Sequence, residues 1–153
     1  MKICGLLRED HIFLDLEPGG KKHILEEFVS ALKKRGLISR EKVILEELLK
    51  RESLGSTGLE KGIALPHALI DKIEEPLLAL AVFKKGVDFE AADQRPTHVI
   101  LLLLGKKDEP GYQLKLLAHI CRLVKETDVV EKIRKAKSAR DICVIFEREE
   151  GKI

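Results

Sequence analysis

Residues 77–83 (LLALAVF) and 98–104 (HVILLLL) are two apolar runs that determine the fold of this 153-residue chain. Runs of this length, rich in Leu and Val, are typical of strands buried on both faces between layers of helices. Helical patterns flank them: apolar residues recur at positions 24, 25, 28, 29 and 32, and Pro110 begins another long pattern. Helices that alternate with apolar strands predict a three-layer α/β domain.

In the first third of the chain, turn and capping residues predict the element boundaries. Residues 12–16 (IFLDL) indicate a short strand, which the Pro-Gly-Gly turn at 18–20 ends. Gly36 is expected just after the first long helix, and Ser39 is expected to cap the second. The predicted buried face of that second helix consists of Val43, Ile44, Leu48 and Leu49.

In the remainder, the glycine-rich residues 55–62 predict a loop, and residues 63–69 predict a short strand. Pro66 confines that strand to a sheet edge or makes it a strand end. The buried stripe of the helix that begins at Pro110 is predicted as Leu114, Leu117, Cys121 and Val124. Asp128 with Glu131 resembles a capping box, and Ser138 is a candidate cap for the last helix.

Composition limits the possible partners and cellular location. The chain is 44% hydrophobic and 35% charged with a net charge of +2, and its mixed charges give no nucleic-acid footprint. Three cysteines without CxxC spacing are expected to be reduced, and those at 121 and 143 to be buried. Charge close to the N-terminus interrupts any signal peptide, and residues 99–104 are too few to span a bilayer. We therefore expect a soluble, cytoplasmic protein without membrane insertion.

Residues 51–67 (RESLGSTGLEKGIALPH) hold the densest group of residues with chemical potential. The order Arg-Glu, Gly-Ser-Thr-Gly and Gly-Ile-Ala-Leu-Pro-His resembles the signature of the fructose/mannitol-class enzyme IIA domains of the bacterial phosphoenolpyruvate-dependent sugar phosphotransferase system (PTS). That type-2 class includes a nitrogen-regulatory branch. HIFLDL at 11–16 and QLKLLAHICRLV at 113–124 also fit, so the resemblance covers nearly the whole chain. It implies one domain over residues 1–153, a three-layer α/β/α sandwich with a mixed central sheet flanked by helices.

The resemblance also implies a role for each residue of this block. His67 matches the histidine that is phosphorylated, and Arg51 matches an arginine beside the phosphoryl group, where its planar fork can pair two oxygens. Ser56 and Thr57 are candidate phosphoryl-binding residues, together with backbone N–H groups of their loop. Taken singly, such a histidine, arginine or Gly-Ser-Thr-Gly turn is more often structural. Their joint order is what favours function.

One position departs from the family pattern. Members commonly carry a second histidine at the start of the helix facing the first, whereas this chain has Gln113 there. An amide can donate a hydrogen bond, but it cannot act as a cation or a proton shuttle. His119 lies about 120° further around the helix, given about 100° per residue, and is predicted to be a packed or rim residue.

The expected function is that of a phosphohistidine carrier, a phosphotransferase component of the PTS. Its His67 would accept a phosphoryl group from the phosphocarrier protein and pass it to an enzyme IIB domain. The alternative is a regulatory domain of the nitrogen-PTS kind, whose phosphorylation state controls target proteins. Neither requires a cofactor or metal, and the sequence has no HxxxH, HExxH or Gly-x-x-x-x-Gly-Lys motif.

Overall fold

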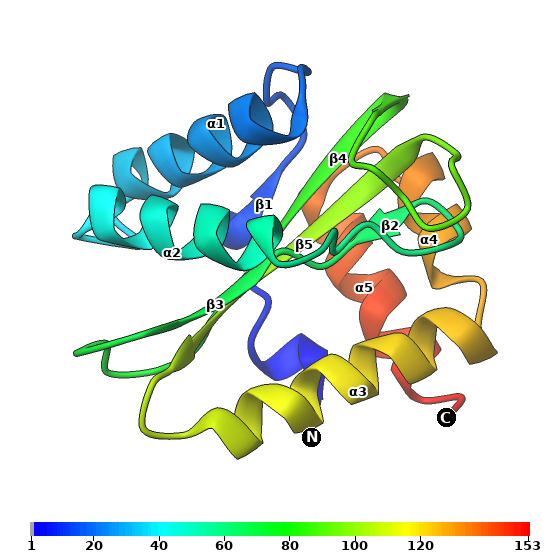
Figure 1. Cartoon of the computed structure of the whole chain (residues 1–153). Coiled ribbons are helices and arrows are strands. Elements are labelled where there is room, and N and C mark those ends of the chain that lie inside the picture. The colour runs from blue at the N-terminus through cyan, green and yellow to red at the C-terminus, as the bar shows by residue number, and fades with distance from the viewer. Residues whose placement is uncertain (1) are drawn as a thin grey trace.

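The computed structural model of the protein describes residues 2–153, which form a five-stranded sheet between two layers of helices (Figure 1). Helices α1 and α2 cover one face of the sheet, and α3, α4 and α5 cover the other. The elements, with two short 3-10 helices η1 and η2, are η1 (Ile3–Gly5), η2 (Glu9–His11), β1 (Ile12–Phe13), α1 (Lys21–Lys34), α2 (Glu41–Ser53), β2 (Ile63–Ala64), β3 (His67–Ile70), β4 (Leu77–Val87), β5 (Thr97–Lys106), α3 (Pro110–Glu126), α4 (Val129–Lys135) and α5 (Ala139–Glu150).

The central pair of strands is antiparallel, and the outer strands are parallel to their neighbours. The order is β1-β4-β5-β2, with β3 also pairing with β5. This arrangement confirms the predicted α/β class with a mixed sheet. None of the helices described in residues 2–153 is long and apolar enough to cross a membrane.

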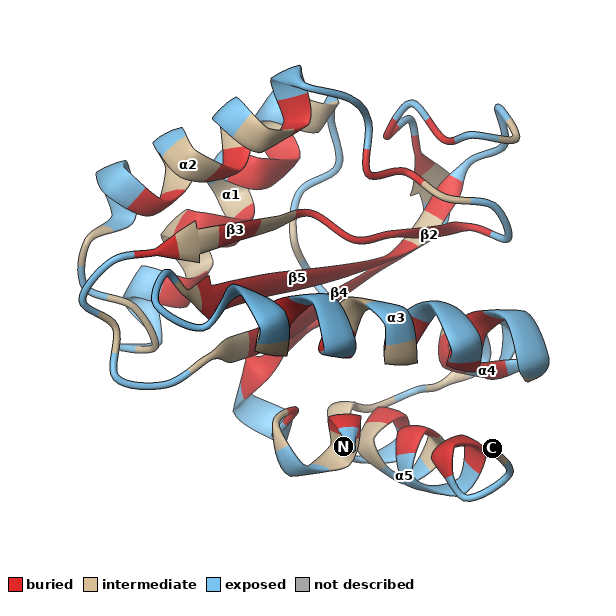
Figure 2. Ribbon diagram, turned by 60° about the horizontal axis from the view of Figure 1, so that its bottom comes forward, coloured by how far each residue is buried: buried red, intermediate tan, exposed pale blue. Residues whose placement is uncertain are grey.

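Strands β4 and β5 separate two hydrophobic cores. Successive side chains of a strand point to opposite faces, so Leu78 and Leu80 pack towards α3, α4 and α5, while Ala79 and Ala81 pack towards α1 and α2. Strand β5 is buried along nearly its whole length, and β4 is buried continuously over residues 78–83, as Figure 2 shows. The apolar runs therefore lack alternation because both faces are covered.

The predicted strand at residues 63–69 is interrupted. It forms β2 and β3, both parallel to β5, with a break at Leu65 and Pro66. The proline has no N–H for a ladder bond, but its carbonyl accepts the Leu103 N–H at 3.0 Å, which keeps the segment on the sheet. The prediction of an edge position is confirmed, and the break places His67 at the start of β3.

The start of α2 differs from the prediction, whereas the end of α1 agrees with it. Gly36 adopts φ +73° just after α1, where the Leu37 N–H bonds back to the Leu32 carbonyl and closes the helix. Ser39 does not cap α2, which begins at Glu41 after Arg40 and has no side-chain cap. The buried face is also narrower than predicted, because Val43 is exposed and Leu49 is only partly buried.

The buried stripe of α3 lies one residue away from the predicted one. The buried residues are Gln113, Leu116, Ile120, Leu123 and Val124, whereas Leu114 and Cys121 are exposed. The error has a simple cause, because the helix carries two apolar series at helical spacing and the periodicity fits both. The observed stripe turns the Gln113 side chain towards the sheet.

At the other helix ends, one predicted cap is confirmed and one is not. Ser138 caps α5 by accepting the Asp141 N–H at 3.1 Å. Asp128 occupies the N-cap position of α4 but forms no side-chain cap bond, and the Thr127 hydroxyl accepts the Val129 N–H instead. The predicted strand at 12–16 is shorter than expected, since β1 ends at Phe13.

A buried carboxylate near the C-terminus holds three segments together. Glu150 accepts the N–H groups of Ile3 at 2.6 Å and Cys4 at 3.0 Å. It also contacts His119 Nε2 of α3 at 2.7 Å, which confirms that this histidine packs away from Gln113. Burial opposes ionisation of Glu150, but these hydrogen bonds outweigh it and hold the pKa of the carboxyl below its ordinary value.

We predict that Glu150→Gln lowers the free energy of unfolding by about 1–3 kcal/mol at pH 7. Because the folded-state pKa lies below the unfolded one, this contribution is complete above the ordinary glutamate pKa and is lost as the pH falls through the folded value. Urea unfolding at neutral and acidic pH should therefore show the two proteins converging in acid. Glu147→Gln, an exposed neighbour, is the control, and equal small effects of both substitutions would contradict the prediction.

Candidate functional site

Three of the predicted site residues line one open groove of about 540 Å³. Arg51 comes from the last turn of α2, His67 from the start of β3, and Gln113 from the first turn of α3. A second hollow of the same volume lies beside α4, and none of the predicted residues lines it. The groove is therefore the candidate site.

The His67 ring has one nitrogen engaged by its own backbone. Its Nδ1 lies 2.8 Å from the Leu65 carbonyl oxygen, and a carbonyl can only accept a hydrogen bond. Nδ1 therefore carries the proton of the neutral ring, and Nε2 keeps its lone pair. Pro66 between the two residues has a fixed φ, which limits how far this turn can relax. The half-buried ring thus has a defined tautomer and a free nucleophilic nitrogen.

Arg51 lies in the last turn of α2, at the C-terminal end of that helix. Its Nη1 donates to the Gly55 carbonyl at 3.0 Å, which anchors the guanidinium over the loop that follows the helix. A guanidinium has five N–H donors in a rigid plane. One described bond therefore leaves donors available for an anion in the groove.

The loop between Arg51 and His67 is held by a buried acid, Glu52. Its carboxylate accepts both the hydroxyl and the backbone N–H of Thr57, the latter at 3.2 Å. The Thr57 carbonyl in turn accepts the Leu65 N–H at 3.0 Å, and Leu65 is the residue that binds His67 Nδ1. A continuous series of hydrogen bonds therefore runs from Glu52 to the histidine.

Lys21 supplies the positive charge beside this acid. Its ammonium lies 2.9 Å from Glu52, 2.8 Å from Glu90 and 2.9 Å from the Ser56 hydroxyl. Burial would lower the pKa of Lys21, but the hydrogen bonds that its ammonium donates to Glu90 and Glu52 outweigh burial and raise that pKa. The lysine therefore remains charged and neutralises the buried acid.

Ser56 and Thr57 lie outside the groove, unlike the other predicted site residues. The Ser56 hydroxyl donates to the Phe89 carbonyl at 2.9 Å, and the Thr57 hydroxyl is bound to Glu52. The next residue, Gly58, packs directly against the backbone around Phe89, and a Cβ at this position would collide with the Phe89 carbonyl oxygen. These contacts give the two hydroxyls a role in shaping the loop and do not support the prediction that they donate hydrogen bonds to the phosphoryl group.

Gln113 is only 6% exposed, and its Oε1 has no hydrogen-bond partner among the described residues. The amide packs against Gly105 of β5, where a Cβ would collide with Oε1. Gly105 pairs with Leu69, two residues after His67, so the amide lies at the same edge of the sheet as the histidine. A buried polar atom without a partner costs about 1–3 kcal/mol and suggests a functional use.

Sequence reasoning missed the residues around the groove. Lys50 and Lys107 add two positive charges to that of Arg51, against one negative lining residue, Glu47. Leu54 and Leu114 are 81% and 69% exposed and form an apolar rim on either side. Leu54 falls outside the helical spacing of the buried residues of α2. This off-pattern leucine is the one signal in the sequence that could have identified the rim.

Comparison with known proteins agrees with this architecture. Residues 5–149 match the family described as "Phosphoenolpyruvate-dependent sugar phosphotransferase system, EIIA 2". A nitrogen regulatory protein of Bradyrhizobium diazoefficiens is 34% identical over 147 residues, which cover 95% of each chain. The fructose-specific EIIABC component of Bacillus subtilis is 31% identical over 95% of this chain, but the chain spans only 23% of that relative's length.

A solved structure gives the same result. Nitrogen regulatory protein IIA-Ntr from Neisseria meningitidis superimposes with a TM-score of 0.84 and 30% identity, covering 94% of this chain and 98% of that one. The family match extends over nearly the whole chain and includes every residue of the groove. The chain belongs to the EIIA 2 family of the phosphoenolpyruvate-dependent sugar phosphotransferase system.

Proposed function

We propose that this protein carries a phosphoryl group on Nε2 of His67, taken from the phosphocarrier protein and passed to an enzyme IIB domain. The observation that supports this most is the hydrogen bond from His67 Nδ1 to the Leu65 carbonyl, which leaves Nε2 unprotonated in the groove. Both partners act in the cytoplasm in this reading, so the protein would act there too.

The transfer conserves bonds and needs no further reactant. The Nε2 lone pair attacks phosphorus, the phosphorus–nitrogen bond to the donor's histidine breaks, and the donor's imidazole leaves with that electron pair. The reverse sequence delivers the group to the acceptor. The Leu65 carbonyl stabilises the positive charge that develops on the ring, because Nδ1–H remains hydrogen-bonded to it throughout.

Positive charge in the groove matches the transferred group. Arg51 has donors to spare for two phosphoryl oxygens, and Lys50 and Lys107 add attraction at longer range. The three cations suffice to balance a dianionic phosphoryl group without a metal ion at this point. Arg51 would thus act as the cationic side chain that stabilises the charge on the phosphoryl group during transfer.

Gln113 is proposed to bind the phosphoryl group after it arrives. Its amide has two N–H donors, and the residue lines the groove together with His67 and Arg51. A neutral amide bond to a charged oxygen contributes more than a neutral pair, about 1.5–3 kcal/mol. The glutamine would thus hold the group without titrating near neutral pH, which a histidine at this position would do.

The apolar rim fits the brief docking of two different partners. Leu54 and Leu114 are large exposed side chains that line the same groove as the histidine. Buried in an interface, such a side chain contributes roughly 1.5–3 kcal/mol, and the exclusion of water would protect the labile phosphorus–nitrogen bond. Donor and acceptor would use the same rim in turn.

A regulatory role is the second candidate, supported by the names of full-length relatives. The Bradyrhizobium and Neisseria proteins, both of nearly the same length as this chain, are described as nitrogen regulatory proteins. In that case the same phosphorylation of His67 would control binding to a target protein. Pull-down of the phosphorylated and unphosphorylated forms from the source organism distinguishes the two, because only a regulatory domain should retain a partner that is neither the phosphocarrier protein nor a IIB domain.

We predict that His67 is the single residue phosphorylated by phosphoenolpyruvate, enzyme I and the phosphocarrier protein. Mass spectrometry of the intact protein should show one added phosphoryl group, labile in acid and stable in base. His67→Ala should acquire none, whereas His98→Ala, whose Nδ1 is held by the Phe83 carbonyl outside the groove, should be labelled normally. Label retained by His67→Ala would refute the assignment.

Arg51 variants test the clamp in the same assay. Arg51→Ala should slow transfer about tenfold to a hundredfold, a loss of roughly 1.4–2.7 kcal/mol of transition-state stabilisation. Arg51→Lys should recover only part, since it keeps the charge but loses the planar fork. A normal transfer rate per folded molecule with a large loss of stability would make Arg51 a structural residue.

We predict that Gln113→Leu stabilises the resting protein while slowing phosphoryl transfer by up to about tenfold. Stability should rise by about 1 kcal/mol, because the buried unsatisfied oxygen is removed. Thr97→Val is the matched control: Thr97 Oγ1 is the other unsatisfied buried oxygen in the described chain but lies away from the groove. It should stabilise without changing the transfer rate. Slowing in both variants, or in neither, would exclude Gln113 from the reaction.

A further inference from the structure

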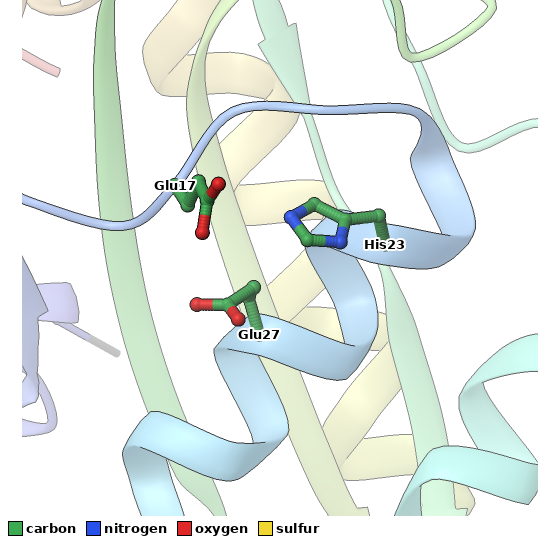
Figure 3. Close-up of side chains that lie close together, drawn as sticks. All are labelled: Glu17, His23 and Glu27. Atoms are coloured by element: carbon green, nitrogen blue, oxygen red, sulfur yellow. The ribbon is translucent and has the colours of Figure 1, made fainter.

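A cluster of three potential metal ligands lies at the start of α1, apart from the groove. Glu17 comes from the loop before the helix, and His23 and Glu27 come from successive turns of α1 (Figure 3). One ligand atom from each side chain lies within 4.8 Å of the other two. Residues four apart on a helix share a face, so His23 and Glu27 both turn towards Glu17.

The donor atoms of this cluster are free of other described contacts. Among residues 2–153, no hydrogen bond or ion pair engages the side chains of Glu17, His23 or Glu27. Two carboxylates and one imidazole therefore approach one another without a hydrogen bond or ion pair to the rest of the described chain, and the two carboxylates repel each other. A bound cation would remove the repulsion and use all three donors. By contrast, the buried acids elsewhere in the chain, such as Glu52 and Glu150, all have partners.

The chain has a local feature that positions the histidine. Gly19 lies so close to the imidazole that a Cβ there would be 2.9 Å from Cγ of His23. A side chain at residue 19 would displace the ring, so glycine allows the loop to pass against it. The ring is thereby held between the loop and α1, and Figure 3 shows it facing the two carboxylates.

The donor set selects a class of metal. One imidazole and two carboxylates suit a divalent first-row transition ion better than Mg²⁺ or Ca²⁺, which prefer oxygen ligands alone. Three protein ligands leave a tetrahedral ion one position for water. Ligand separations shorten to about 3.4 Å around a tetrahedral ion bound at about 2.1 Å, a change that rotation of the partly exposed glutamates can provide.

We propose that Glu17, His23 and Glu27 form a binding site for a divalent transition-metal ion of the Zn²⁺ class. The ion would fasten the loop after β1 to the first two turns of α1. The HxxxH and HExxH motifs each contain two histidines. They therefore do not detect a single histidine with two glutamates from separate segments. The site is independent of the reaction at His67, which requires no metal.

The test is titration of the chelator-treated protein with Zn²⁺ by calorimetry, and with Co²⁺ by absorption spectroscopy. We expect one equivalent of Zn²⁺ to bind, and Co²⁺ to give a spectrum without a thiolate charge-transfer band, since no cysteine belongs to the site. His23→Ala, Glu17→Gln and Glu27→Gln should each weaken binding by at least about tenfold. Zn²⁺ should also raise the melting temperature of the wild-type protein and not that of His23→Ala.

Two substitutions control for unspecific binding. Glu26→Gln removes an exposed carboxylate next to Glu27 that is outside the cluster, and His67→Ala removes the histidine of the groove. Both should bind Zn²⁺ as the wild-type protein does. The proposal is overturned if no saturable binding occurs, if binding survives His23→Ala unchanged, or if Glu26→Gln weakens it as much as Glu27→Gln. Because each outcome is measured without phosphoryl transfer, failure here leaves the proposed function unaffected.

Discussion

The candidate site depends on a buried carboxylate, Glu52, and its hydrogen bonds to Thr57. A charge taken out of water costs several kcal/mol unless it is paired and hydrogen-bonded, and Lys21 provides the pairing. These bonds fix the course of the loop. The Thr57 carbonyl then holds Leu65, and the Leu65 carbonyl sets the tautomer of His67. Arg51 is the residue before Glu52 on the same turn of α2. The end of this one helix therefore both shapes the loop and supplies a cation to the groove.

The layered fold could be predicted from the sequence because two long apolar runs require cover on both faces. The position of side chains around a helix could not. Residues 114, 117 and 121 of α3 are apolar and helically spaced, but so are the buried residues 116, 120 and 123, and only packing against the sheet distinguishes the two series. That choice buries Gln113 and exposes Leu114, which is why the groove and its rim were only partly foreseen. Position 52, by contrast, continues the buried spacing of Ile44 and Leu48, so its burial was detectable.

The order of residues 51–67 predicted His67, Arg51, Ser56 and Thr57 as site residues, and the first two line the groove whereas the two hydroxyl residues do not. In sequence, Ser56 and Thr57 are nearer to the histidine than the arginine is, and loop hydroxyls can donate hydrogen bonds to an anion. In the structure, each hydroxyl bonds to the protein itself and lies outside the groove. Groups that converge in space, Arg51, His67 and Gln113, come from three separate elements, and their proximity follows from the fold alone.

The central claim is that His67 is a nucleophile through Nε2, with Nδ1–H held by the Leu65 carbonyl. Nuclear magnetic resonance of protein with ¹⁵N-labelled histidine measures this directly, before and after phosphorylation. We predict the Nδ1–H tautomer for neutral His67 in the resting protein, and phosphorus–nitrogen coupling to Nε2 once the phosphoryl group is attached. A proton on Nε2 in the neutral resting ring, or coupling to Nδ1 in the phosphorylated protein, would contradict the account.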